Sequence, residues 1–172
     1  MTIEPFLDLI DRMTSRRVRY VVIGLAGANY YARSASQLFV TQDRDLFLPG
    51  DARNLLDAWN AGKEAGYQLW AGKEPLGEPI DEWLAARISS HRAGTTAIHP
   101  DGVEVDFSLA MAGFDFERVW NGRRTFRVEE REIPVARLSH IVESKAHADR
   151  PKDRLFLATY EELLQKMLED ED

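Results

Sequence analysis

Cysteine is absent from the 172 residues of this chain, and its absence excludes several kinds of site. Without thiols there is no disulfide bond, no zinc–thiolate centre and no cysteine nucleophile. Chains without disulfides are typical of reducing compartments, so we expect a cytoplasmic protein.

Long apolar runs are absent as well. The uninterrupted apolar stretches span only a few residues, whereas a membrane-spanning helix needs about 20. Residues 1–13 carry acidic side chains within their apolar pattern, which is not the pattern of a signal peptide. We therefore expect a soluble chain with no membrane partner.

The chain also lacks a net positive charge. Its formal net charge is -7, whereas proteins that bind nucleic acid without sequence preference are usually basic. Acidic residues gather in residues 168–172, while Arg123, Arg124, Arg127 and Arg131 form a local basic group. This balance disfavours RNA as a partner, although the basic group leaves it open.

The spacing of apolar residues predicts a mixture of helices and strands. Helical repeats predict helices over residues 5–15, 26–31, 52–65, 82–87, 139–148 and 154–169. β-Branched or alternating runs predict strands over residues 20–23, 38–48, 67–70, 95–99, 103–109, 123–128 and 132–135. Residues 71–80 hold two prolines and two glycines and are predicted to form a loop, and residues 114–119 are ambiguous.

Two of these strand pairs have the spacing of hairpins. A Pro-Asp-Gly turn over residues 100–102 separates one pair, and a short connection separates the strands over 123–128 and 132–135. Hairpins beside helices favour the α+β class, with a mixed or antiparallel sheet flanked by helices. The length of the chain fits one domain over residues 1–172.

Two aspartates stand out in the predicted strand over residues 38–48. Asp43 and Asp45 are two residues apart, so they would share a face of the strand at a separation of roughly 7 Å. Unpaired like charges so placed repel each other and cost stability. A divalent cation removes this cost, because Mg²⁺ prefers hard oxygen ligands. The Asp-x-Asp pattern alone is nevertheless common by chance.

Asp106 lies in the middle of the strongly apolar strand over residues 103–109. The apolar side chains at 103, 105, 107 and 109 would share one face, which leaves Asp106 on the other. Aspartate is unfavourable within a strand, and such local conflicts concentrate at functional sites. On its own, such a position is more often a solvent-facing one on an exposed face of a sheet.

Taken together, these segments resemble the nucleotidyltransferase superfamily. Residues 21–28 (VVIGLAGA), followed by Thr41-x-Asp43-x-Asp45, are similar to the first motifs of its minimal bacterial members and of the AbiEii class of toxin-type transferases. Asp106 matches the aspartate that these proteins carry on a later strand. Residues 133–145 and the Arg-Pro-Lys-Asp turn match two further motifs, so the resemblance covers roughly residues 18–165.

The resemblance implies a nucleotidyltransferase-like fold, with a core over about 18–135 and a helical part over about 136–172. It implies transfer of a nucleoside monophosphate from a nucleoside triphosphate to a hydroxyl of RNA, protein or a small molecule. Asp43 and Asp45 would bind Mg²⁺, or Mn²⁺ in its place. Asp106 would complete the metal and catalytic set and help to activate the acceptor hydroxyl.

The nucleotide phosphates would lie at the turn of Gly24 and Leu25 and near Lys145. For Lys145 an exposed, solubilising role is an equal alternative. Asp153 is predicted to cap the last helix. Arg44, between the two aspartates, would point to the other strand face and pair with an acidic residue.

One position departs from the family pattern. Leu25 stands where the family usually has glycine or serine, and leucine resists the close approach of backbone N–H groups to phosphates. This departure motivates a second hypothesis, a non-catalytic member that acts as a binding partner in a toxin–antitoxin pair. A metal-dependent glycosyltransferase ranks last, because such domains are longer.

Overall fold

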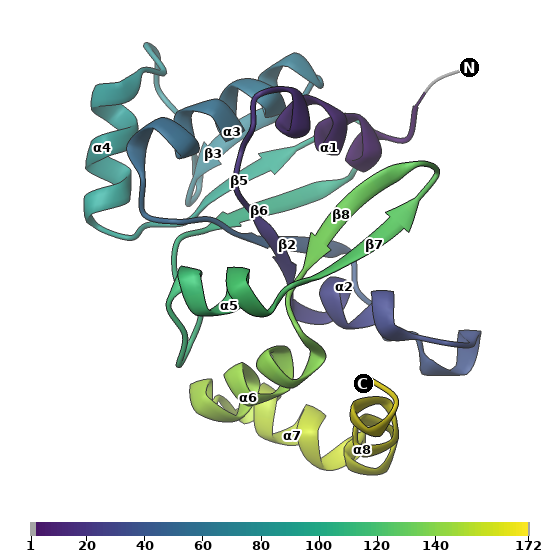
Figure 1. Ribbon diagram of the computed structural model, residues 1–172. Coiled ribbons are helices and arrows are strands. Elements are labelled where there is room, and N and C mark those ends of the chain that lie inside the picture. Colours follow the sequence, from purple (N-terminus) through teal and green to yellow (C-terminus); the bar gives the residue numbers. More distant parts are fainter. Residues whose placement is uncertain (1–2, 172) are drawn as a thin grey trace.

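The computed structural model describes residues 3–171, so the ends of the predicted domain at residues 1–2 and 172 lie outside the described residues. Within that range, one sheet of eight strands runs in the order β4-β3-β5-β6-β2-β1-β8-β7 (Figure 1). The strands are β1 (Val21–Ile23), β2 (Asp43–Phe47), β3 (Gln68–Ala71), β4 (Glu74–Pro75), β5 (Thr95–Ile98), β6 (Glu104–Ser108), β7 (Arg124–Val128) and β8 (Arg131–Val135).

Helices cover both faces of the sheet. They are α1 (Pro5–Ser15), α2 (Gly24–Ala28), α3 (Ala52–Glu64), α4 (Glu82–Ser90), α5 (Phe116–Gly122), α6 (Leu138–Ala148), α7 (Pro151–Thr159) and α8 (Glu161–Glu169), with short 3-10 turns η1 (Asn29–Tyr31) and η2 (Ala35–Gln37). None of the helices within residues 3–171 has the length and apolar character needed to cross a membrane.

The sheet is mixed, because parallel and antiparallel pairs alternate near its centre. β2 lies antiparallel to β1 but parallel to β6, and β1 lies parallel to β8. The pairs β3–β4, β3–β5, β5–β6 and β7–β8 are antiparallel. The two predicted hairpins and the α+β class with a mixed sheet are therefore confirmed.

Alternation along the central strands divides the core into two clusters. Leu46 on β2 and Phe107 on β6 pack with α1, α3 and α4 on one face. Phe47 on β2 faces the opposite side, where it packs with residues of α5, α6 and α8 (Figure 1). Asp45 and Asp106 belong to this second face, because they alternate with Leu46 and Phe107.

The predicted strand over residues 38–48 is wrong in its first half. β2 begins only at Asp43. The side chain of Asn29 accepts a hydrogen bond from the backbone N–H of Phe39 at 2.8 Å and donates one to its carbonyl oxygen at 2.9 Å. Both backbone groups of Phe39 are thus used by a side chain and do not pair with a strand.

The predicted helix over residues 154–169 is two helices, α7 and α8, that meet at Tyr160. Its backbone leaves the helical region, with φ -109° and ψ 20°. The Tyr160 ring packs against Phe39 and Phe156, with centroid separations of 5.2 and 5.1 Å. The change of direction allows Leu164 and Met167 of α8 to be buried in the second cluster.

Smaller differences concern the other predicted elements. The helix predicted over residues 26–31 begins earlier, at Gly24, and its last part is the 3-10 turn η1. The ambiguous residues 114–119 contribute to α5, which Asp115 caps through a 2.8 Å bond from the N–H of Arg118. The predicted loop over residues 71–80 includes the short edge strand β4.

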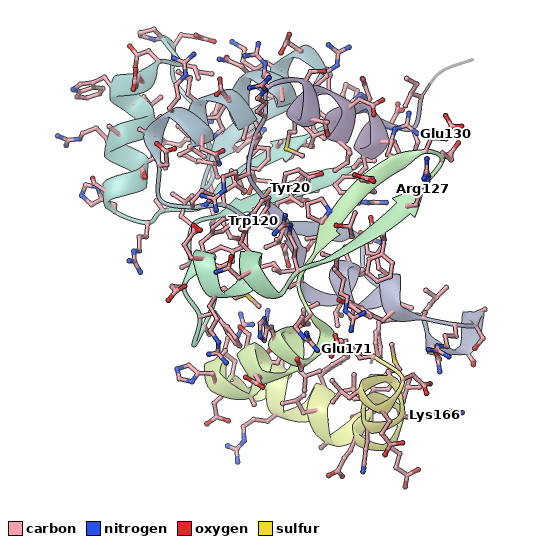
Figure 2. All side chains as sticks on the ribbon, viewed as in Figure 1. Tyr20, Trp120, Arg127, Glu130, Lys166 and Glu171 are labelled. Carbon is pink, nitrogen blue, oxygen red and sulfur yellow. The ribbon has the colours of Figure 1, made fainter. Side chains whose placement is uncertain are left out.

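Glu171 supplies the cap that the first turn of α6 lacks. The N-cap residue of α6, Arg137, makes no side-chain capping bond. The carboxylate of Glu171 accepts hydrogen bonds from the backbone N–H groups of Leu138, at 2.5 Å, and Ser139, at 3.3 Å. A negative charge at a helix N-terminus also stabilises the helix dipole. Figure 2 shows Glu171 beside the start of α6.

We predict that Glu171→Ala lowers the free energy of unfolding by about 1 kcal/mol, the usual cost of losing a helix cap. The amide protons of Leu138 and Ser139 should exchange faster with solvent, because both lose their acceptor. Chemical denaturation and hydrogen exchange measure the two effects. Glu169→Ala, on an exposed position of α8, is the matched control. Equal stability of the two variants would contradict this role of Glu171.

Candidate active site

A cavity of about 620 Å³ lies between the second face of the sheet and α6. Asp45 and Asp106 line it from the strands, and Gly24 lines it at the start of α2. Lys145 of α6 and Arg150, which precedes α7, line it from the helices. The cavity therefore has carboxylates on one wall and cationic side chains on another.

Strand register brings Asp45 and Asp106 together. In the parallel pair β2–β6 their Cα positions are direct partners, so the two carboxyl groups lie side by side on the second face of the sheet. Burial raises the pKa of Asp45 to about 6, and the hydrogen bond with Asp106 and the negative charges of Asp106 and Asp43 act in the same direction. Protonation of Asp45 relieves its repulsion with the neighbouring carboxylates.

The third predicted carboxylate, Asp43, lies apart from this pair. Its register partner is Glu104, and its side chain is exposed at the start of β2. It lines a separate pocket of about 190 Å³ together with Tyr30 and Arg44. Across residues 3–171, no three or more histidine, aspartate or glutamate side chains are close enough together to hold a metal ion.

The Asp45–Asp106 pair nevertheless has the chemistry of a magnesium site. Mg²⁺ is usually held by one or two carboxylates together with substrate phosphates, rather than by a cage of protein ligands. The two carboxyl groups offer hard oxygen ligands at one point of the cavity wall. Their mutual repulsion is the kind that a bound cation removes.

Position 24 requires glycine, because its backbone lies in close contact with the Asp45 side chain. Its backbone has φ +69°, a conformation that favours glycine. A Cβ atom at this position would lie 2.6 Å from Oδ2 of Asp45, well inside contact distance. Leu25 packs against the second hydrophobic cluster and is not part of the cavity lining. Its side chain thus leaves the cavity open.

Lys145 and Arg150 are held by one buried carboxylate. Asp153, only 1% exposed, accepts bonds from Nε of Arg150 at 2.6 Å and from Nη2 at 3.2 Å. The Lys145 ammonium lies 3.7 Å from the same carboxylate and 5.0 Å from the centre of the Phe156 ring. Burial lowers the pKa of Lys145, and the charge of Asp153 opposes this effect.

The other predicted side-chain roles near the site are modified by the structure. Asp153 is the third residue of α7 rather than its N-cap, and it accepts a bond from the backbone N–H of Arg150 at 3.3 Å. Arg44 faces the α1 side of the sheet, opposite to Asp45, as the alternation predicts. Its guanidinium, however, lies over the ring of Phe6, 5.0 Å from the ring centre, and has no acidic partner among residues 3–171.

Two cavity residues were missed by sequence reasoning. Thr96 of β5 donates a hydrogen bond to Oδ1 of Asp106 at 2.8 Å. Its position follows from the hairpin register, which pairs Thr96 with Asp106, and the turn at residues 100–102 was the signal that fixes this register. Arg150 was visible in the Arg-Pro-Lys-Asp turn, but its place in the cavity depends on how α6 and α7 meet.

Comparison with solved structures identifies the fold. The lincosamide antibiotic adenylyltransferase LnuA, in a lincomycin-bound crystal structure, matches with a TM-score of 0.58 and 13% sequence identity, over 100% of this chain and 99% of that one. An antigenic nucleotidyltransferase-like protein from Paracoccidioides brasiliensis matches with a TM-score of 0.52 and 13% identity, over 97% of this chain and 74% of that one. No family model matches the sequence, and no curated protein does.

These similarities show that the chain has a nucleotidyltransferase fold, as the sequence motifs indicate. They do not include a protein described as AbiEii-like. The narrower resemblance to that toxin class therefore stays a prediction.

We predict that Asp45→Asn raises the melting temperature of the metal-free protein by roughly 3 °C at about pH 7.5, which corresponds to about 1 kcal/mol in a chain of this size. The pKa of Asp45 in the folded protein, about 6, exceeds the usual value of about 3.9. The stability that the protonated group contributes is therefore present below about pH 4 and is lost as the pH rises through about 6.

The gain from Asp45→Asn should accordingly shrink as the pH is lowered toward 4. Added MgCl₂ should stabilise the wild type and not the variant. Differential scanning calorimetry across this pH range measures both effects, with Asp170→Asn, at an exposed position, as the charge-matched control. A variant that melts below the wild type at every pH would overturn the prediction.

We predict that Gly24→Ala reduces the stabilisation by MgCl₂, because the added Cβ would push the Asp45 carboxylate out of place. Positive φ at a residue other than glycine costs about 1–3 kcal/mol by itself. Gly102→Ala separates the two effects, because Gly102 has φ +95° and open space around its Cβ position. Thermal melting with and without MgCl₂ should show the loss only in Gly24→Ala; an equal loss in both variants would contradict the contact with Asp45.

Proposed function

We propose that this protein is a magnesium-dependent nucleotidyltransferase that moves a nucleoside monophosphate from a nucleoside triphosphate to the hydroxyl group of a small molecule. The observation that carries the proposal is the pairing of Asp45 with Asp106 in a cavity whose helical wall presents Lys145 and Arg150. Phosphoryl transfer depends mainly on positioning and on neutralising charge, and this arrangement offers both.

Asp45 and Asp106 would hold Mg²⁺, or Mn²⁺, at the strand wall. Asp43 faces the same side of β2 two residues earlier and is the proposed third ligand. The bound ion would neutralise charge on the nucleotide phosphates. Lys145 and Arg150 would contact the phosphates from the helical wall, and Gly24 would leave room for them beside Asp45.

In the proposed reaction, the acceptor hydroxyl oxygen attacks the α-phosphorus. A new P–O bond forms there while the bond to the β-phosphate oxygen breaks, and pyrophosphate leaves. The hydroxyl proton passes to the carboxylate of Asp106. Asp106 suits this role because its carboxylate lines the cavity and the Thr96 hydroxyl engages only one of its two oxygens.

Three observations support a small molecule as the acceptor. The cavity volume of about 620 Å³ lies within the range of about 300–1,000 Å³ that is usual for small-molecule sites. The formal net charge of -7 does not favour a polyanion such as RNA. LnuA, whose structure contains lincomycin, matches this chain over nearly its whole length.

The non-catalytic alternative was motivated by Leu25. Because Leu25 packs into the second cluster and does not line the cavity, its side chain does not favour that alternative. A toxin or antitoxin partner stays a prediction from the narrower resemblance.

The test is incubation of the purified protein with each α-³²P-labelled nucleoside triphosphate, MgCl₂ and a panel of acceptors. The panel holds hydroxylated small molecules, including a lincosamide, together with RNA and protein. We expect label on a small molecule, and a decrease of at least about 100-fold in Asp45→Asn and Asp106→Asn, as for loss of a principal catalytic interaction. Asp170→Asn should match the wild type.

Label on RNA or protein alone would overturn the choice of acceptor. No labelled product with any nucleotide or acceptor, or equal transfer by Asp106→Asn and the wild type, would overturn the proposed reaction.

A further inference from the structure

Asp106 has a hydrogen-bond donor on the strand that adjoins β6 on the side away from β2. β5 and β6 are antiparallel neighbours (Figure 1), and Thr96 is the direct partner of Asp106. The Thr96 hydroxyl donates to Oδ1 of Asp106 at 2.8 Å, and both side chains line the cavity. Asp106 therefore lies between Thr96 on one side and Asp45 on the other.

Thr95, the residue before Thr96, is held by a hydrogen bond on the opposite face of the sheet. Adjacent strand residues point to opposite faces, so Thr95 faces the first cluster. Its hydroxyl accepts a 3.0 Å bond from Nε1 of Trp59, whose side chain is fully buried. The backbone of β5 is thus fixed at Thr95, which limits the movement of Thr96.

The hydrogen bond matters because Asp106 faces a carboxyl group on its other side. Repulsion from Asp45 favours rotation of the Asp106 carboxylate away from the pair. A hydroxyl group offers one donor, and here that donor engages one carboxylate oxygen and leaves the other oxygen for a further partner. Thr96 therefore opposes the rotation without occupying both oxygens.

We infer that Thr96 is a positioning residue, which holds the Asp106 carboxylate beside Asp45 in the orientation that metal binding and hydroxyl activation need. This inference rests on the proposed function and extends it to a residue on a third strand. Partners that orient a metal-binding carboxylate typically change metal affinity or activity by 10- to 100-fold when removed.

Thr96→Val tests the inference with little change in shape. Valine keeps the β-branched form that suits a strand and removes only the hydroxyl donor. Thr96→Ser restores the donor. Thr125→Val is the matched control, because Thr125 is an exposed threonine on β7, which four other strands separate from β5 in the sheet order.

Three measurements are made on each variant: Mn²⁺ binding by electron paramagnetic resonance without nucleotide, kcat and KM for label transfer, and a crystal structure. We expect Thr96→Val to bind Mn²⁺ roughly 10- to 100-fold more weakly, with a lower kcat and a rotated Asp106 side chain. Thr96→Ser should recover most of the Mn²⁺ affinity and of kcat. Thr125→Val should match the wild type in all three measurements.

The outcomes separate the inference from the function on which it rests. Wild-type Mn²⁺ affinity and kcat in Thr96→Val, with Asp106 in its original orientation, would overturn the inference and leave the proposed function standing. A wild type that neither binds Mn²⁺ nor transfers label would instead overturn the proposed function. Equal losses in Thr96→Val and Thr96→Ser would assign Thr96 a packing role and would also overturn the inference.

Discussion

The parallel pairing of β2 with β6 is the constraint on which the candidate site depends. It places Asp45 opposite Asp106, although the two carboxyl groups repel each other when both are ionised. A shift of the register by one residue would turn the buried side chains of Leu46 and Phe107 out of the core. Hydrophobic burial on one face of the sheet thus holds like charges together on the other.

The helical wall of the cavity carries positive charge opposite these carboxylates. Lys145 and Arg150 approach from the helical wall, and both are held by Asp153. Because Asp153 is buried and contacts both cations, it ties them to the same part of the cavity wall. The site therefore separates charge between its walls, and a nucleotide phosphate chain with its cation complements both.

Local patterns predicted the elements that local forces determine. The bounds of α1 and the two hairpins follow from periodicity and turn residues. The order of the motifs along the chain identified Asp45 and Asp106 as candidate site residues. The predicted strand over residues 38–48 does not form at Phe39, because the Asn29 side chain bonds its backbone. The predicted helix over residues 154–169 is interrupted at Tyr160, whose ring contacts another segment. Local periodicity does not predict either contact. Asp43 shares a strand face with Asp45 but lines a separate pocket, which alternation alone does not predict, and its metal-binding role stays a prediction.

The capping of α6 by Glu171 has a consequence for the order of synthesis. The strands that carry the acidic wall are complete by residue 108, and α6 itself is complete by residue 148. The first turn of α6 nevertheless acquires its capping carboxylate only when residue 171 has left the ribosome and α8 has docked. The helical wall therefore gains its cap only after every residue that lines the cavity has been synthesised.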